Sequence, residues 1–393
     1  MNKKFKTAVL SLAVTSTLAP MLAAPAVKLL MMDFPDASST LVQSIVTFPS
    51  FFIIPALLIV SLLSRFLSKK VILVIGLILY TIGGVGPAAM NSIVGILILR
   101  GVLGLSIGFL TPTMNALIAE YFVGDERLRM NGLTTAINGI GGAFFLLVGG
   151  TITAFGWRGV FFTYAYGLVL LVLVILFVPA TKPSRTASSV QKDQKKKAAS
   201  LSIGVVSVGL SATALMILYY TVPTNLAAFI IDNGYGNSAT SGYMTAISFT
   251  FVFLAGISGA RLKNLLLRAF VPIVVLILGL GALLMGTASS LWAVAASVGL
   301  IGFGFGLAYP VLLSRVASAA KPESVTLAVS SLTAFANIGQ FITPYVTKGI
   351  EMAFRLNSIR GVFLVLAVVL GILLFWTAVK GFRTTKRSNP LGT

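Results

Sequence analysis

Twelve long apolar stretches, separated by short hydrophilic joints, constrain the fold of this chain more than any other feature. They cover residues 7–32, 38–64, 71–90, 93–119, 130–155, 159–179, 201–231, 239–260, 268–288, 291–317, 324–350 and 358–379. Each is close to the length of about 20 residues that an α-helix needs to cross a bilayer. The pattern therefore predicts an all-α membrane protein with twelve transmembrane helices.

The composition supports this class and excludes several others. Hydrophobic residues make up 57% of the chain and charged residues only 10%, values that a soluble domain of this size does not show. The chain has no Cys and no His, so we expect no disulfide, no thiol chemistry, no metal site and no bound cofactor. The net charge of +20 falls mainly in the joints, which argues against a nucleic-acid partner.

The basic residues are distributed unevenly between alternate joints. With the N-terminus in the cytoplasm, 23 Lys and Arg residues fall in cytoplasmic joints and four in outer joints. The positive-inside rule then predicts a multi-pass protein of the cytoplasmic membrane with both termini in the cytoplasm. The first stretch also resembles a signal peptide, with a basic start and Ala24-Pro25-Ala26 as a small-residue site. We favour a plain first transmembrane helix, because the apolar run continues to Met32 and the later helices then alternate correctly.

The two halves of the chain repeat each other. Gly108-x-x-x-Pro112 recurs as Gly306-x-x-x-Pro310, and Arg158-Gly159-Val160-Phe161 recurs as Arg360-Gly361-Val362-Phe363. Parallel repeats of this kind are a known transporter architecture, with the substrate site between the repeats near the midplane. We therefore expect one six-helix bundle in residues 1–180 and a second in residues 201–393.

The hydrophilic stretch between the repeats, residues 181–200, carries a run of three lysines. We interpret it as a cytoplasmic linker that touches anionic lipid headgroups, since charge runs are usually solvated. A specific partner site is the alternative interpretation.

On these motifs the chain resembles the major facilitator superfamily. The family pattern R-x-x-x-G-x-x-x-G in the fourth helix is met by Arg100, Gly104 and Gly108. The glycine ladder of the fifth helix in proton antiporters is matched by residues that we expect to pack against other helices: Gly132, Gly141, Gly149 and Gly150. The resemblance implies a monomeric carrier that works by alternating access.

Two departures from the family pattern affect the expected mechanism. Ser64 stands where the loop between helices two and three normally has an aspartate. Phe145-Leu146 stands where the antiporter signature has Gly-Pro, which weakens the argument for antiport.

Arg100 is the deepest charge in the predicted membrane region. A cation there is tolerated only when it faces protein or a water-filled cavity, and by default it marks a functional site. The alternative is a structural role, in which it bonds to carbonyls of the first or second helix. With neutral polar and aromatic groups it forms our predicted cavity lining: Arg100, Asn115, Asn138, Tyr219, Tyr220, Asn225, Tyr309, Asn337 and Gln340.

No acidic residue lies near the middle of a predicted span, so the acids suggest gates rather than a central proton relay. Glu120 could pair at the cytoplasmic mouth with Arg65, Lys69 or Arg129, as the family resemblance implies. The repeat also places residue 29 opposite Asp232, so Asp232 could face Lys28 across the outer mouth. The alternative is that water simply solvates these acids, because an exposed ion pair contributes only about 0–1 kcal/mol to stability.

Two functions follow. The first is export of an amphipathic neutral or anionic compound, coupled to the proton gradient. The second is uptake or exchange of a small organic anion, which a cavity with a cation and no buried acid favours. An enzyme or channel is not expected, because the chain shows no nucleophile–base pair, phosphate loop or filter motif.

Overall fold

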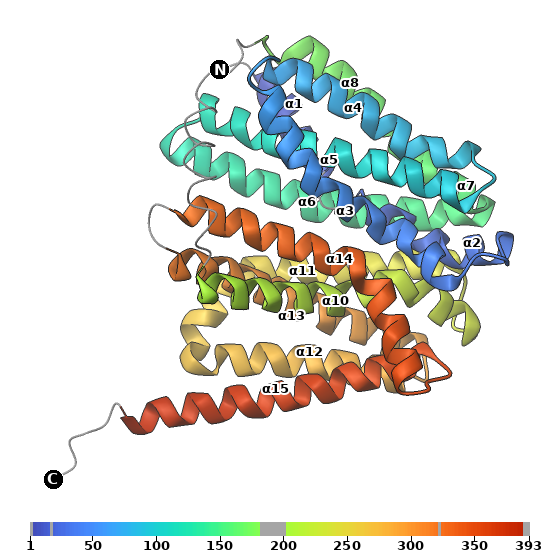
Figure 1. Ribbon diagram of the computed structural model, residues 1–393, viewed down its shortest axis with the longest axis vertical. Helices are drawn as coiled ribbons and strands as arrows, with labels where there is room; N and C mark the ends of the chain where they lie inside the picture. Colours follow the sequence, from blue (N-terminus) through green and yellow to red (C-terminus); the bar gives the residue numbers. More distant parts are fainter. Residues whose placement is uncertain (1–2, 16–18, 181–201, 321–323, 388–393) are drawn as a thin grey trace.

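The computed structural model describes residues 3–15, 19–180, 202–320 and 324–387. Within these residues the regular secondary structure is helical throughout, which confirms the predicted all-α class. The helices form two bundles that lie side by side, one in blue to green and one in yellow-green to red (Figure 1). The predicted linker and its lysine run lie outside the described residues.

The N-terminal bundle consists of the following helices: α1 (Lys3–Ser11), η1 (Leu12–Thr15), η2 (Met21–Ala26), α2 (Val27–Asp33), α3 (Ser39–Leu63), α4 (Lys69–Val85), η3 (Gly86–Ala89), α5 (Ile93–Tyr121), α6 (Gly124–Ile152), η4 (Thr153–Phe155), α7 (Trp157–Phe162), η5 (Thr163–Ala165) and α8 (Tyr166–Phe177). The C-terminal bundle consists of α10 (Ile203–Asp232), α11 (Ser238–Leu266), η7 (Leu267–Ala269), α12 (Phe270–Thr287), α13 (Leu291–Ala319), α14 (Val325–Ala353) and α15 (Ile359–Arg387).

Several long helices begin at a serine whose side chain caps the first turn. Ser38, Ser68, Ser202 and Ser290 each accept a hydrogen bond from the backbone N–H three residues later. Such a cap satisfies one of the four N–H groups that the first turn leaves without a helical partner. The polar joints of the sequence therefore fix where the apolar helices start.

Among the described residues, nine helices are long and apolar enough to cross a membrane. One of these nine, residues 238–287, contains both α11 and α12, which run as two separate crossings. The predicted eleventh span corresponds to α14. The remaining predicted span, the first, differs from the plain helix that we expected.

The first span is broken in the middle. It consists of α1, η1, η2 and α2, with Pro20 and Pro25 near the interruption. Proline has no backbone N–H and disrupts an α-helix, so backbone carbonyls are freed at membrane depth. The equivalent first span of the second repeat, α10, is a continuous helix of 30 residues.

The repeats pack their helices in the same way. A Cβ atom on Gly104 of α5 would lie 2.1 Å from the carbonyl oxygen of Pro49 in α3, and one on Gly302 of α13 would lie 2.3 Å from that of Ser248 in α11. Only glycine allows backbones to approach so closely. Gly108 and Gly306 make the corresponding contacts with Ala56 and Ala255.

Candidate substrate cavity and gates

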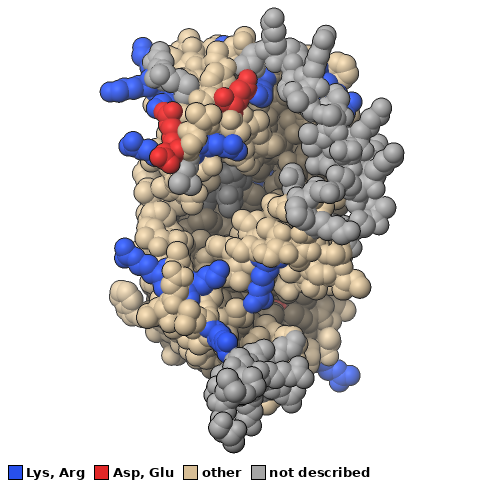
Figure 2. All heavy atoms as spheres, turned by 90° about the vertical axis from the view of Figure 1, so that its left-hand side faces the viewer, with Lys and Arg blue, Asp and Glu red and all other residues tan. Residues whose placement is uncertain are grey.

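The molecule has two different ends. We call "basic end" the end at which α3, α5, α11 and α13 finish, where Lys and Arg gather in Figure 2. We call "opposite end" the end at which α2, α6, α10 and α14 finish. Figure 2 shows a hollow at the basic end between the upper and lower parts of the molecule. The candidate cavity therefore opens at the basic end.

Polar side chains of α3 join the two bundles toward the opposite end. The Gln43 Nε2 atom donates to Asn225 Oδ1 of α10 at 2.7 Å, and Ser50 Oγ donates to Gln340 Oε1 of α14 at 2.6 Å. Between them, Thr47 Oγ1 lies 3.4 Å from the Phe341 carbonyl oxygen. Asn225 and Gln340, which we predicted as cavity lining, thus form part of the closed contact between the bundles.

A second contact between the bundles is formed by α6 and α11. A Cβ atom on Gly150 would lie 2.9 Å from the Cα of Gly242, and one on Gly242 would lie 2.5 Å from the Cα of Gly150. Real Cβ contacts are essentially never this short. The two backbones therefore touch at a point that only glycine on both helices permits.

An ion pair crosses between the bundles at the opposite end. The Lys28 Nζ atom of α2 lies 2.6 Å from Asp232 Oδ1 at the end of α10. The Asp232 side chain keeps 55% of its surface exposed and that of Lys28 keeps 22%. The partners are those that the repeat indicated. Solvent screens a pair so exposed, so its contribution to closing the gate is small.

Toward the basic end the bundles separate. Gly139 of α6 still contacts the Phe253 ring of α11, where an added Cβ would lie 2.9 Å away. Nearer the basic end, Gly132 of α6 and Gly256 of α11 have nothing within 4 Å of an added Cβ. The contact between the bundles is therefore tight toward the opposite end. It is open at the basic end, where Figure 2 shows the hollow.

Arg100 is completely buried within the N-terminal bundle. Its guanidinium group donates to the carbonyl oxygens of Ile45 and Pro20, each at 2.8 Å, and to that of Ala19 at 3.4 Å. It also donates to the Tyr164 hydroxyl at 2.8 Å. Arg100 thus bonds to carbonyls of the first and second spans, which is the structural alternative that we considered, and its fully buried guanidinium group has no surface open to a solute.

The break in the first span explains why a cation is needed there. Ala19 and Pro20 lie at the interruption, and their carbonyl oxygens accept from Arg100. The repeat offset of 198 residues places Val298 of α13 at the position equivalent to Arg100. Val298 is also fully buried, beside the unbroken α10. The bundle with the broken first span therefore carries the arginine, and the bundle with the continuous one carries an apolar residue.

The predicted aromatic lining forms a stack in the C-terminal bundle. The Tyr219 ring of α10 lies 4.0 Å from that of Phe305 in α13, centroid to centroid, and Phe305 lies 5.9 Å from Tyr309. Tyr219 and Tyr220 are buried, and Tyr309 is half-buried. Of these, Tyr309 has the surface available for contact with a solute.

The predicted asparagines lie in three different settings. Asn115 is exposed on α5, and Asn138 is half-buried on α6. Asn337 is buried, and its Nδ2 atom donates to the Thr333 carbonyl oxygen of its own helix at 2.9 Å. Of the repeat-related pair Asn138 and Asn337, Asn337 bonds within α14 and is the more deeply buried.

At the basic end, the predicted acid of the inner gate pairs within its own bundle. Glu120 of α5 forms an ion pair with Lys69 of α4, and Glu126 of α6 pairs with Lys6 of α1. Arg129 is exposed on α6 and Arg65 is half-buried between α3 and α4. The Glu120–Lys69 pair ties two neighbouring helices and does not cross between the bundles in this conformation.

The glycines of the predicted ladder differ in their surroundings. Gly150 lies at the contact with Gly242, and Gly141 faces the Val14 side chain at 3.2 Å. Gly149 has only an ordinary contact, 3.8 Å from the Leu22 carbonyl oxygen. Gly132 faces open space, so the expectation that it packs against a helix is wrong in this conformation.

Sequence reasoning missed the polar face of α3. Gln43, Thr47 and Ser50 recur at spacings of four and three residues, which places them on one face of a helix. Such a face in an apolar helix predicts contact with protein, since lipid offers no hydrogen-bond partner. The signal was present, but it did not indicate that the partners lie on α10 and α14.

The two helical bundles, closed against each other at one end and separated by a hollow at the other, are typical of membrane carriers. The Major Facilitator Superfamily model matches residues 9–344, and this chain belongs to that family. Members of this family are carriers rather than enzymes.

The similar proteins are distant in sequence. The chain is 21% identical over 339 residues to the multidrug transporter protein MdtP of Bacillus subtilis, covering 70% of this chain and 62% of that protein's length. A bacterial homologue of the human lysosomal transporter Spinster, in an inward-facing and unoccupied conformation, has a TM-score of 0.73 at 15% identity, over 97% of this chain and 99% of that one. A peptide transporter, POT, in complex with sulfate has a TM-score of 0.74 at 14% identity, over 97% and 95% of the two chains.

Proposed function

We propose that this chain exports an amphipathic neutral or anionic compound across the cytoplasmic membrane, in exchange for protons. The observation that carries the proposal is the asymmetry of the contact between the bundles. Polar pairs and the Gly150–Gly242 contact close the opposite end, while a hollow opens at the basic end. The positive-inside rule supports a cytoplasmic position for the basic end. A solute from the cytoplasm can then enter the hollow.

The chemistry of the hollow supports the proposed cargo. In the described residues the acids lie near the ends of the helices, and none lies at mid-membrane. A lipophilic cation would need a buried carboxylate, whereas a neutral or anionic compound can use aromatic surface and amide groups. The relationship to a protein named as a multidrug transporter supports export.

The location of Asp232 limits its part in proton coupling. A carboxylate that carries protons across the membrane must exchange with both sides. Asp232 is at the end of α10 at the opposite end, and 55% of its side chain is exposed there. We therefore assign Lys28 and Asp232 to the outer gate and not to proton transfer across the membrane.

The test uses everted vesicles with an acidic interior. Neutral, anionic and cationic compounds are added and collapse of the pH gradient is recorded. In the Gln43→Cys/Asn225→Cys variant, a short reducible bifunctional thiol reagent joins two side chains that contact each other here. Because the chain has no Cys of its own, the reagent has no other target.

We expect neutral or anionic compounds to collapse the gradient, cross-linking to abolish the collapse, and reduction to restore it. Collapse that survives complete cross-linking would contradict alternating access at this gate. Collapse by cations alone would contradict the proposed cargo.

The second candidate is uptake or exchange of a small organic anion. The observation that favours it is the lack of mid-membrane acids in the described residues, so no carboxylate is seen there to carry a proton. This candidate predicts counterflow of labelled organic anions with no collapse of a pH gradient. The same cross-linked variant serves as its control.

A further inference from the structure

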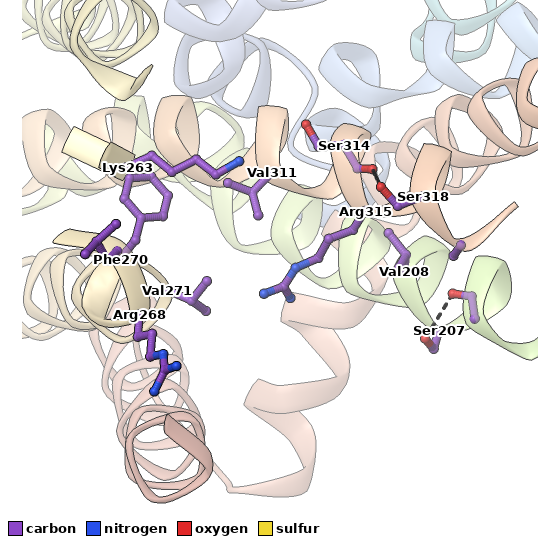
Figure 3. A pocket seen from close by; sticks show the side chains of 13 residues that line it. Ser207, Val208, Lys263, Arg268, Phe270, Val271, Val311, Ser314, Arg315 and Ser318 are labelled. Atoms are coloured by element: carbon purple, nitrogen blue, oxygen red, sulfur yellow. Dashed lines mark hydrogen bonds between the residues drawn. The ribbon is translucent and has the colours of Figure 1, made fainter. Parts of the chain in front are cut away.

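A pocket of about 700 Å³ lies at the basic end of the C-terminal bundle (Figure 3). Its lining comes from the start of α10, the joint between α11 and α12, and the end of α13. The apolar part of the wall includes Val208, Val271 and Val311. The pocket is thus built by four helices of one bundle and does not require the other bundle.

Three cations line this pocket and no acid does. Lys263, Arg268 and Arg315 come from α11, η7 and α13, and all three are exposed. Figure 3 shows the Arg315 side chain reaching into the space between α13 and the α11–α12 joint. Within residues 202–320 and 324–387, the acids are Asp232 and Glu351, both toward the opposite end. In the described structure the positive charge of the pocket therefore lacks a protein counter-charge.

The pocket differs from the equivalent place in the N-terminal bundle by the loss of an acidic residue. The contacts Ala56–Gly108 and Ala255–Gly306 are equivalent, with offsets of 199 residues for α3 and α11 and 198 for α5 and α13. The offset of 198 relates Glu120 to Ser318, and Lys69 and Arg268 are both cations near the start of the next helix, Lys69 at the first residue of α4 and Arg268 in the turn before α12. In the N-terminal bundle Lys69 and Glu120 form an ion pair. In the C-terminal bundle the cation is kept, but a serine stands in place of the carboxylate, and both residues line the pocket.

We propose that this pocket binds a phosphate group whose negative charge is not balanced by a cation of the same molecule, and that this group supplies from outside the negative charge that Glu120 supplies within the N-terminal bundle. Arginine matches the geometry of phosphate oxygens with two parallel N–H donors, and lysine adds a compact charge. Basic pockets between transmembrane helices on the cytoplasmic side bind lipid headgroups by this chemistry. The anion would tie the end of α13 to the α11–α12 joint, as the Lys69–Glu120 pair ties α5 to α4.

Two sources can present this anion, an anionic phospholipid headgroup or a soluble phosphate. The experiment separates them with the full-length protein in nanodiscs. One arm replaces phosphatidylcholine stepwise by phosphatidylglycerol, and the other adds inorganic phosphate to pure phosphatidylcholine discs. The midpoint of thermal unfolding is recorded in both arms at constant ionic strength, because salt screens exposed charges.

The test variant is Arg268→Gln/Arg315→Gln, and the matched control is Arg261→Gln, which removes an exposed cation of α11 that does not line the pocket. We expect one anion source to raise the midpoint, and the test variant to need about tenfold more of it, since two charge-assisted contacts are lost. The control should respond like the unmodified protein. Stabilisation by phosphatidylglycerol alone identifies a lipid headgroup as the source, and stabilisation by phosphate identifies a soluble anion.

A second variant, Ser318→Glu, keeps the proposal testable if the double variant does not fold. It restores the acid of the N-terminal bundle, so we expect a higher midpoint without added anion and a smaller response to it. The proposal is overturned if neither source stabilises the protein, or if Arg261→Gln loses as much of the response as the double variant. It is also overturned if Ser318→Glu responds to the anion as strongly as the unmodified protein.

Discussion

Replacing Arg100 by Ala is expected to destabilise the N-terminal bundle strongly. The change removes a fully buried guanidinium group that bonds to three carbonyl oxygens and to the Tyr164 hydroxyl. Those four acceptors lie on η5, α3 and the broken first span. At membrane depth no water replaces the lost donors.

The magnitude follows from the contacts. A hydrogen bond from a charged donor contributes about 1.5–3 kcal/mol, and such contributions do not add fully within one network. We therefore expect a loss of about 3–5 kcal/mol for Arg100→Ala, as for other changes that leave buried polar groups without partners. Arg100→Lys retains the charge but not the planar fork, so it should lose about 1.5–3 kcal/mol.

The assay is unfolding by dodecyl sulfate in mixed micelles, followed by helical circular dichroism. The matched control is Arg158→Ala in the same bundle, because Arg158 is exposed, bonds to Asn91 and lies 4.3 Å from the Trp157 ring. That variant should lose no more than about 1 kcal/mol. If Arg100→Ala is as stable as Arg158→Ala but loses transport, Arg100 acts on the solute and the structural argument is wrong.

Two further predictions concern the outer gate, and both use Thr47→Cys as a reporter, since the chain has no other thiol. Gly150→Val should prevent the close contact with α11, where an added Cβ meets backbone at 2.9 Å, and should raise labelling of the reporter by a membrane-impermeant maleimide from outside. Gly132→Val has open space and should leave labelling unchanged, and equal labelling of the two variants would refute the packing argument. Asp232→Asn should raise labelling by at most about fivefold, because a pair this exposed contributes no more than about 1 kcal/mol. The exchange Lys28→Asp/Asp232→Lys re-forms the ion pair and should return labelling to the level of the unmodified protein. Labelling that stays high in the exchanged variant would show that the pair is not part of the gate.

Some functional contacts could be predicted from the sequence because the repeat relates them. The offset between the halves places residue 29 opposite Asp232, and the structure has Lys28 2.6 Å from Asp232. The glycine spacing of Gly104 and Gly108 indicated a close helix contact, and these residues face α3. In both cases the information lies in residue type and spacing along the chain.

Other contacts could not be predicted, because their partners are far apart in the sequence and are related by no repeat. Gln43 and Asn225 are 182 residues apart, and Ser50 and Gln340 are 290 apart. The sequence indicates that each polar group in an apolar helix needs a partner, but not which one. The sequence therefore predicts Asn225 and Gln340 in the cavity lining, whereas the structure places them in hydrogen bonds between the bundles.

The sequence by itself determined the class of this protein, because hydropathy, span length and loop charge reflect the bilayer and not the tertiary contacts. The family and the two-fold repeat follow from the same linear pattern. Only the tertiary structure decided the part of Arg100. The membrane rule states that a buried cation must find partners. Two of the four acceptors of Arg100 are carbonyl oxygens at the break in the first span, Ala19 and Pro20, and the other two lie on α3 and η5. That break, and the continuous α10 beside Val298, depend on how the helices pack, which no local pattern specifies.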